Sequence, residues 1–209
     1  KVLLLIPHLG GGGAERVTEL LALNLSVDKY ELHLGLITQS DSSEDLPSCV
    51  QVHALGAERV RGGPFRLLRL IRQLEPELIL SGMFHLNFLV LFLRPFFPPN
   101  TRVMVRQNGT VSSALAFDGL PCYTRLLYQL LYRRADRVIC QTQSMADDIA
   151  RTLRIDQKRL AVLANPVDLG EIRRFIGPWR WEGSHLKRVL ICCCGPLLRS
   201  DENFTMPAL

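Results

Sequence analysis

The residues of this chain with the clearest chemical potential form a glycine loop near the amino end. Four glycines at 10–13 follow an apolar segment at 2–6 and precede an apolar-periodic helix. Such glycines let the backbone adopt positive φ and approach a ligand closely. The start of the helix directs free N–H groups and a partial positive charge at the same point. The loop therefore predicts a phosphate or diphosphate site made by Gly11, Gly12, Gly13, Ala14 and Glu15.

The spacing of these glycines excludes two common phosphate loops. A P-loop needs Gly-x-x-x-x-Gly-Lys-Ser/Thr, but Gly13 is followed by Ala-Glu-Arg. A dinucleotide fingerprint also fails, because Glu15 stands three residues after Gly12, where a third glycine or alanine is needed. The second expected strand, 31–37, is followed by Thr38 and not by an acidic residue that would bind ribose. A glycine-rich turn with a purely geometric role remains the alternative.

Polar residues also follow the other expected strands. Because ligands of parallel α/β sheets bind beyond the carboxyl ends of the strands, the loops after residues 6, 81, 106 and 141 should converge on one crevice. Each residue also has an ordinary explanation, since Ser and Thr cap helices and Asn-Gly forms turns. The candidate ligand contacts in these loops are His8, His85, Asn87, Arg106, Gln107, Asn108 and Thr142.

The elements that must position these residues alternate between strand and helix patterns. This alternation is typical of an α/β fold with a parallel sheet. Expected strands are 2–6, 31–37, 50–53, 77–81, 102–106, 137–141, 160–163 and 188–193. Expected helices are 14–25, 64–74, 83–93, 120–134 and 144–153. Ser144 and Asp147 have the spacing of a capping box that opens the last of these helices.

Composition agrees with a compact α/β chain. Of its 209 residues, 47% are hydrophobic and 22% charged, which suffices for a sizeable core. The net charge of +5 favours an anionic partner such as a nucleotide, a phospholipid surface or a nucleic acid. Nucleic acid ranks last, because the basic residues are spread among helices and no finger or helix-turn-helix spacing is present. We therefore expect no nucleic-acid partner.

The six cysteines bear on metals and compartment. They stand at 49, 122, 140 and 192–194, without a Cys-x-x-Cys pair. Three adjacent cysteines in a strand alternate faces and cannot all bind one metal. We expect no metal site, buried free thiols and a reducing, cytoplasmic compartment. No leader precedes the first strand, and the apolar stretch at 88–97 is interrupted by Arg94 and too short to span a bilayer.

Two expected helices raise the question of a membrane surface. In the helix at 64–74, arginines at 66, 69 and 72 share one face, and apolar side chains fill the other. The helix at 120–134 combines three tyrosines with three arginines. Such basic amphipathic helices are suited to peripheral contact with anionic lipid. The favoured alternative is a surface helix that packs its leucines on the sheet and solvates its arginines.

Three motifs, in this order, resemble the amino-terminal domain of glycosyltransferase family 4. They are the glycine loop at 11–15, the segment Tyr132-Arg-Arg-Ala-Asp-Arg-Val-Ile-Cys-Gln-Thr-Gln-Ser144, and Asn165-Pro166-Val167-Asp168. The resemblance extends to residue 176 and implies the GT-B fold, in which two Rossmann-like domains face each other across a cleft. Residues 1–168 would be the acceptor-side domain, while the other half normally grips the nucleotide-sugar.

The resemblance also implies roles for single residues. Gly12 and Gly13 correspond to the loop that lies against the donor's diphosphate, and His85 is the nominee for general base. Many relatives carry a further histidine at the end of the next strand, where this chain has Arg106. No cofactor is implied beyond the nucleotide-sugar co-substrate, and the acceptor would be a glycan or a lipid-linked sugar.

The carboxyl-terminal part departs from the family pattern. Residues 169–187 form an expected linker, and 188–209 an incomplete start of a donor-binding domain. The family shows Gly-Arg-Leu and then a lysine, two cations that neutralise the leaving diphosphate. Here the corresponding residues are Gly-Pro-Leu at 195–197 and Glu-Asn-Phe at 202–204, so both cations are absent.

Two functions follow from the resemblance. In the first, the chain is the acceptor half of a retaining, metal-independent glycosyltransferase of polysaccharide or glycolipid biosynthesis, and is inactive unless completed by a carboxyl-terminal domain. In the second, it is a noncatalytic or degenerate half-domain that docks acceptor and membrane for a partner chain supplying the donor site. The sequence is either a fragment of such an enzyme or a separate half-length chain. We expect it in the cytoplasm, with peripheral membrane contact as an open alternative.

Overall fold

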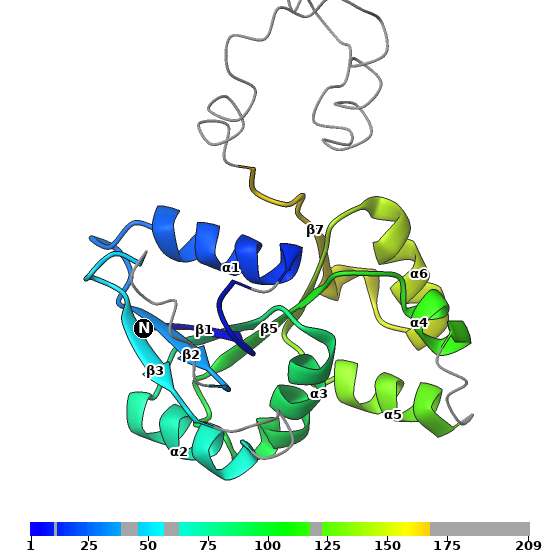
Figure 1. Ribbon diagram of the computed structural model, residues 1–209. Coiled ribbons are helices and arrows are strands. Elements are labelled where there is room, and N and C mark those ends of the chain that lie inside the picture. Colours follow the sequence, from blue (N-terminus) through cyan, green and yellow to red (C-terminus); the bar gives the residue numbers. More distant parts are fainter. Residues whose placement is uncertain (11, 39–45, 57–62, 118–122, 168–209) are drawn as a thin grey trace, which may run out of the picture. The chain divides into compact units, whose positions relative to one another are not determined.

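One parallel sheet organises the part of the chain that the structure describes. The computed structural model describes residues 1–10, 12–38, 46–56, 63–117 and 123–167 (Figure 1). Seven strands lie in the order β3-β2-β1-β4-β5-β6-β7, and all neighbouring pairs are parallel. The strands are β1 (Val2–Ile6), β2 (Leu32–Leu36), β3 (Gln51–Ala54), β4 (Leu78–Ser81), β5 (Arg102–Gln107), β6 (Arg137–Cys140) and β7 (Leu160–Val162).

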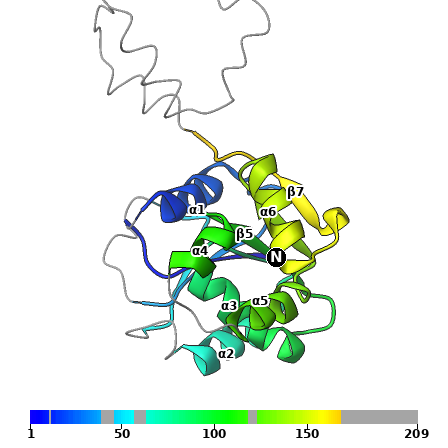
Figure 2. The same ribbon diagram turned by 90° about the vertical axis from the view of Figure 1, so that its right-hand side faces the viewer.

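Helices connect the strands and lie on both faces of the sheet. They are α1 (Gly13–Asn24), α2 (Pro64–Leu74), α3 (Phe84–Leu93), α4 (Val111–Phe117), α5 (Tyr123–Tyr132) and α6 (Gln143–Leu153), with 3-10 turns η3 (Arg94–Phe96) and η4 (Gln157–Arg159). Helix α1 lies on one face, and α2, α3 and α5 lie on the other (Figures 1 and 2). The strand order reverses between β1 and β4, and such a switch point is where doubly wound sheets bind ligands.

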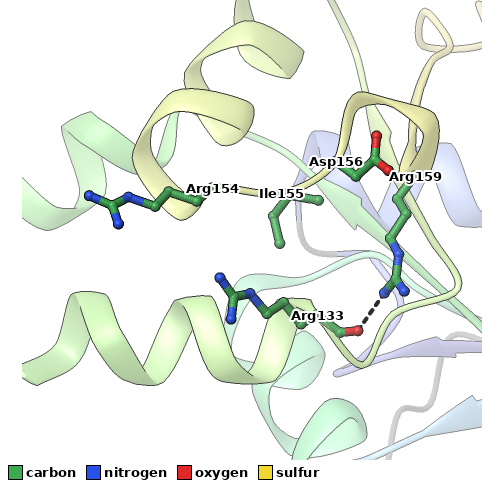
Figure 3. Close-up of a pocket in the computed structure, with 5 residues that line it drawn as sticks. All are labelled: Arg133, Arg154, Ile155, Asp156 and Arg159. Atoms are coloured by element: carbon green, nitrogen blue, oxygen red, sulfur yellow. Dashed lines mark hydrogen bonds between the residues drawn. The ribbon is translucent and has the colours of Figure 1, made fainter.

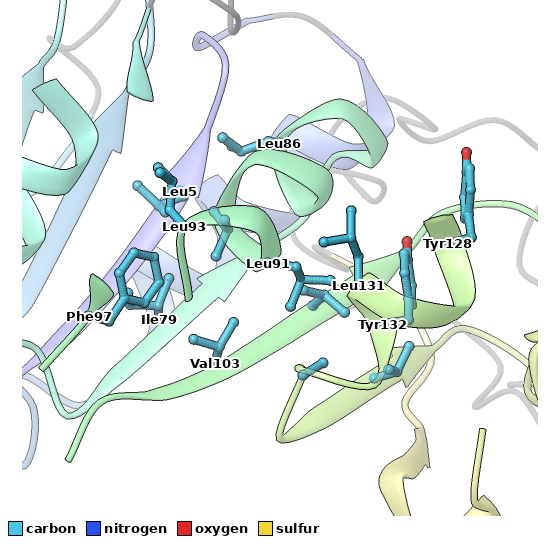
Figure 4. Close-up of a cluster of buried hydrophobic side chains, with 14 of the residues drawn as sticks. Leu5, Ile79, Leu86, Leu91, Leu93, Phe97, Val103, Tyr128, Leu131 and Tyr132 are labelled. Atoms are coloured by element: carbon cyan, nitrogen blue, oxygen red, sulfur yellow. The ribbon is translucent and has the colours of Figure 1, made fainter. Parts of the chain in front are cut away.

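The central strands are apolar along their whole length because both of their faces are covered. All residues of β1 and β2 are buried. The larger core cluster packs Leu5 and Val103 of the sheet against α3 and α5, with Tyr132 among its largest side chains (Figure 4). On the other face, Leu4 of β1 belongs to a second cluster with Ala22 of α1. The sheet is thus held from both sides.

Close packing between β1, β2 and α2 explains the glycine in β2. A Cβ at Gly35 would lie 2.6 Å from Cδ2 of Leu5 and 3.6 Å from Cδ2 of Leu70. Both leucines belong to the core, where side chains have little room to move. Gly35 therefore serves packing and not ligand binding.

Two histidines pair at the edge formed by β2 and β3. Nδ1 of His33 lies 3.0 Å from Nε2 of His53, and Nε2 of His33 lies 3.1 Å from Oε1 of Glu31. Only one proton fits between Nδ1 of His33 and Nε2 of His53, because N–H groups on both atoms would point at each other and break the contact. Burial, and secondly the neighbouring His33, lower the pKa of His53. The pair is thus a pH-sensitive contact in the sheet.

The structure confirms the expected parallel α/β fold. Each expected strand from 2–6 to 160–163 is present, with ends shifted by at most one residue. Helix α4 was not expected, and the expected linker and strand beyond residue 168 lie outside the described residues. The expected capping box at Ser144 is wrong. Helix α6 begins at Gln143, and Oγ1 of Thr142 is the cap that accepts from the amide of Met145.

The side chains of α2 match the favoured alternative for that helix. Leu67 and Ile71 are fully buried in the larger core cluster, and Arg66 donates to the carbonyls of Leu55 and Gly56. Across the described ranges, no helix is long and apolar enough to cross a membrane. Of the cysteines in those ranges, Cys140 is a buried free thiol, as expected, and Cys49 is exposed.

Candidate functional site

At the carboxyl edge of the sheet, where the parallel strands end, neighbouring loops contact one another. A Cβ at Gly82 would lie 3.5 Å from Oγ1 of Thr18, so α1 packs against the turn between β4 and α3. The side-chain amide of Asn108 donates to the carbonyl of Gly82, and Nε2 of Gln141 donates to Oδ1 of Asn108 over 3.5 Å. These contacts join the loops after β4, β5 and β6, three of the four that the sequence predicted to converge, and the fourth, after β1, leads into the helix that contacts Gly82.

The glycine loop is partly capped by the chain's own carboxylates. The amide of Gly12 donates to Oε2 of Glu15 over 3.0 Å, and the amide of Gly10 donates to Oε1 of Glu19 over 3.1 Å. Glu15 thereby takes the position of the acidic residue in a capping box at the start of α1. One of the amides expected to bind a ligand, that of Gly12, is therefore already hydrogen-bonded, and Gly11 lies outside the described residues.

Two amides of the same loop remain open. Gly13 and Ala14 are the first residues of α1, and neither amide has a hydrogen-bond acceptor among the described residues. A Cβ at Gly13 would meet nothing within 4 Å, so neither packing nor backbone conformation requires glycine there. At Gly10, by contrast, a φ of 72° requires glycine or a strained residue. Gly13 thus has open space beside it, and neither its amide nor that of Ala14 has an acceptor in the described part of the chain.

Arg106 contributes a buried cation at the end of β5. Its side chain is only 3% exposed, and its guanidinium donates to Oδ1 of Asn165, in the segment that follows β7. Its Nε is buried without a hydrogen-bond partner in the described part of the chain. Burial lowers the pKa of Arg106. Because no carboxylate in that part of the chain pairs with it, an anionic ligand would compensate its charge.

Two expected contact residues lie inside the protein. Asn87 is fully buried, and its Nδ2 donates to the carbonyl of Arg106 over 2.9 Å. Oε1 of Gln107 accepts from the hydroxyl of Tyr132 over 2.7 Å, and burial raises the pKa of that tyrosine. These bonds tie α3, β5 and α5 together beneath the candidate site. Their observed role is to position the strand end that carries Arg106.

The two expected histidines are exposed. His8 follows β1, and His85 lies in the first turn of α3. Neither ring has a hydrogen-bond partner in the described ranges, so no carboxylate orients them there. Thr142 also lies at this edge, but its hydroxyl is engaged as the cap of α6.

Two residues that were not among the candidate ligand contacts become functional candidates in the structure. Ser81 ends β4, is fully buried, and its hydroxyl has no partner among the described residues. Asn165 was noted only as part of a motif, yet it is the partner of Arg106. Position at a strand end was the available signal for Ser81, whereas the contact of Asn165 spans 59 residues and leaves no local pattern.

The sheet order and the switch point define a Rossmann-like α/β domain, with polar loops at its carboxyl edge. The family model described as Glycosyltransferase Family 4 matches residues 11–171. The chain therefore belongs to glycosyltransferase family 4.

A curated relative and solved structures agree with this family. The chain is 28% identical over 186 residues to the N-acetylgalactosamine-N,N'-diacetylbacillosaminyl-diphospho-undecaprenol 4-alpha-N-acetylgalactosaminyltransferase of Campylobacter jejuni, covering 82% of this chain and 49% of the relative. Anabaena HepE in complex with UDP and glucose aligns with a TM-score of 0.58 and 15% identity, over 81% of this chain and 45% of HepE.

A glycosyltransferase from Rickettsia africae aligns with a TM-score of 0.56 and 12% identity, over 92% of this chain and 48% of that structure. At such identities the structural matches establish the fold, a Rossmann-like α/β domain like those of GT-B glycosyltransferases. The chain spans about half the length of the relatives it matches.

Proposed function

We propose that this chain is the acceptor-side half of a glycosyltransferase that transfers a sugar from a nucleotide-sugar to a lipid-linked acceptor. The family membership supports sugar transfer, and the Campylobacter relative is named for a diphospho-undecaprenol-linked acceptor. Solved neighbours hold UDP or UDP-glucose, which favours a uridine diphosphate donor. The observation that carries the proposal is that, among the described residues, the amides of Gly13 and Ala14 have no acceptor and Arg106, at the same sheet edge, has no carboxylate partner.

In this proposal the amides of Gly13 and Ala14 and the guanidinium of Arg106 together stabilise the negative charge of the reacting groups. The amides at the start of α1 bind the donor's diphosphate, and the helix dipole favours the negative charge that grows as the diphosphate leaves. The bond from the anomeric carbon to the diphosphate oxygen breaks, and a bond to the acceptor hydroxyl oxygen forms. His85, exposed and unpaired in the described ranges, accepts the hydroxyl proton.

We further propose that transfer requires a second Rossmann-like domain, provided by the same polypeptide or by a partner chain. Coverage of only 44% to 49% of the relatives supports this requirement. The alternative of a noncatalytic half-domain that docks the acceptor for a partner has the same structural support. Transfer measured with and without a supplied donor-binding chain separates the two.

Peripheral membrane contact belongs to the same proposal, because a lipid-linked acceptor resides in a membrane. In α2, Leu67, Leu70 and Ile71 are buried and Phe65 is 87% exposed, whereas α5 exposes several leucines, so α5 is the better candidate helix. Its Leu126, Leu127 and Leu130 are 57%, 43% and 51% exposed, and Arg133 and Arg134 directly follow the helix. Leucines beside arginines are typical of helices that lie in the interface of anionic membranes.

The donor-site proposal is tested by NMR titration of the chain with UDP-, GDP- and ADP-sugars. We expect saturable shifts of the backbone amide signals of Gly13 and Ala14, largest with the UDP-sugars. If none of the three classes moves these amides, the loop is not a diphosphate site and the proposal fails. The proposal fails equally if the titration moves only signals far from the carboxyl edge.

A further inference from the structure

A second cavity with a basic lining lies at the amino edge of the sheet, where the strands begin. Its volume is about 290 Å³, and it is lined by Arg133, Arg154, Ile155, Asp156 and Arg159 (Figure 3). These residues follow α5 and α6 and precede β6 and β7. The glycine loop and Arg106 lie at the opposite, carboxyl edge, so this cavity is separate from the candidate transferase site.

Arginines at helix ends often serve only to bind the last free carbonyls of the helix. Here side chains other than those of Arg133 and Arg154 bind the carbonyls at the ends of α5 and α6. Nη1 of Arg159 donates to the carbonyl of Arg133 over 2.6 Å (Figure 3), and both Arg125 and Gln129 donate to the carbonyl of Thr152, over 3.2 and 3.3 Å. Helix capping therefore does not account for Arg133 and Arg154.

The guanidinium groups of Arg133 and Arg154 are unpaired. Neither has a hydrogen bond or ion pair with another described residue. Figure 3 shows that the two side chains extend in the same direction, away from Arg159. The carboxylate of Asp156 is engaged by the amide of Lys158 over 2.9 Å. Three arginines against one acid leave the cavity with a positive charge.

Arg133 and Arg154 line the same cavity, and like charges repel each other unless an anion lies between them. A planar guanidinium presents paired donors that match the oxygens of a phosphate group, and two of them can bind one phosphate from different sides. The cavity is larger than a phosphate alone needs and leaves room for a small attached group. Its apolar floor is the buried Ile155.

We propose that this cavity binds the phosphate group of a phosphorylated ligand through Arg133 and Arg154. Arg159 holds the end of α5 in place by its bond to the carbonyl of Arg133. The phosphate belongs either to a free phosphorylated molecule or to the headgroup of an anionic lipid. The lipid source has an apolar surface available, because the exposed Leu130 lies one turn before Arg133 on α5.

The test uses NMR of the arginine Nε–Hε signals in the 209-residue chain, with inorganic pyrophosphate as the probe. We expect the Arg133 and Arg154 signals to shift saturably. Arg133→Gln and Arg154→Gln should each weaken pyrophosphate binding at least about tenfold, because each removes one charged, two-donor contact. The control is Arg151→Gln, which removes the same charge one turn earlier on α6 and outside the cavity.

Equal binding by the two cavity variants and the Arg151→Gln control would overturn the proposal, since it would show only general charge screening. Shifts that are unsaturable and spread evenly over all arginines would do the same. The glycine loop is a second place where pyrophosphate could bind. The cavity signals should therefore also shift in a Gly13→Val variant, which separates failure here from failure of the transferase proposal.

Vesicle flotation then identifies the source of the phosphate. Vesicles of phosphatidylcholine containing phosphatidic acid are compared with pure phosphatidylcholine, using the chain and its Arg154→Gln and Leu130→Ser variants. Flotation that needs phosphatidic acid and is lost in both variants supports a lipid headgroup in the cavity. Pyrophosphate binding without flotation supports a free phosphorylated ligand. Flotation that both variants retain, together with absent pyrophosphate binding, refutes the cavity as a phosphate site.

Discussion

Substitution of Gly13 should affect the stability of the chain and its ligand binding in opposite directions. A Cβ at this position meets nothing within 4 Å, and Gly13 is the first residue of α1. Alanine should therefore fold without strain and stabilise the chain by about 0.4–1 kcal/mol, through the lower entropy of the unfolded state. For a chain of this size that corresponds to a rise in Tm of about 1–4 °C. Thermal unfolding followed by circular dichroism measures this effect.

The same change should weaken diphosphate binding. A phosphate oxygen must come within about 2.9 Å of each of the two amide nitrogens, and we expect a side chain at position 13 to crowd that approach. Each charge-assisted bond lost costs about 1.5–3 kcal/mol, so Gly13→Val, the bulkier variant, should bind UDP at least about tenfold more weakly. Gly13→Ala should fall between Gly13→Val and the unmodified chain.

The matched control is Gly109→Ala, because a Cβ there also meets nothing within 4 Å. Calorimetric titration with UDP should give the unmodified affinity for this variant. Unchanged UDP affinity in Gly13→Val would refute the reasoning, because the open amides would then not contact the diphosphate. A fall in Tm for Gly13→Ala would show separately that the local packing is misjudged.

Three further predictions concern other parts of the domain. Glu15→Gln should lower the free energy of unfolding, measured by chemical denaturation, by about 0.5–2 kcal/mol through a weaker helix cap. It should also tighten pyrophosphate binding, measured by calorimetry, because it removes a competing charge. Weaker pyrophosphate binding would contradict this. Gly35→Ala should cost about 1–3 kcal/mol, because its Cβ would overlap Leu5 in the core, and an unchanged Tm would show that the core can adjust. The pKa of His53 in the folded chain is lowered from 6.5, so the free energy of unfolding should fall as the pH drops below 6.5. In urea unfolding, this pH dependence should be flatter for His53→Gln but unchanged for His85→Gln. The same pH dependence in both variants would reject the pairing.

The sequence predicted the strands well, for a physical reason. Buried parallel strands form continuous apolar runs, as in β1 and β2, so their positions can be recognised without tertiary information. The short helix α4 has no clear periodicity in Val-Ser-Ser-Ala-Leu-Ala-Phe and was not recognised. At α6, both Thr142 and Ser144 have a capping side chain, and only the observed backbone identifies Thr142 as the cap.

The candidate site shows where sequence information ends. A polar residue at a strand end can face a ligand or the interior, and tertiary packing decides between these outcomes for Asn87 and Gln107. The bond between Glu15 and the amide of Gly12 was predictable in principle, because an acidic residue three positions after a helix cap is a known local pattern. The contact between Arg106 and Asn165 was not, because it joins distant segments.

The carboxylates of Glu15 and Glu19 act as resident anions within the glycine loop. A monovalent ion such as chloride offers the loop no more charge than the carboxylate it would displace, so it gains little by entering. A group with two or more negative charges and several oxygens can engage the open amides while the resident carboxylates stay in place. We therefore expect the loop to prefer multiply charged oxyanions over monovalent ions.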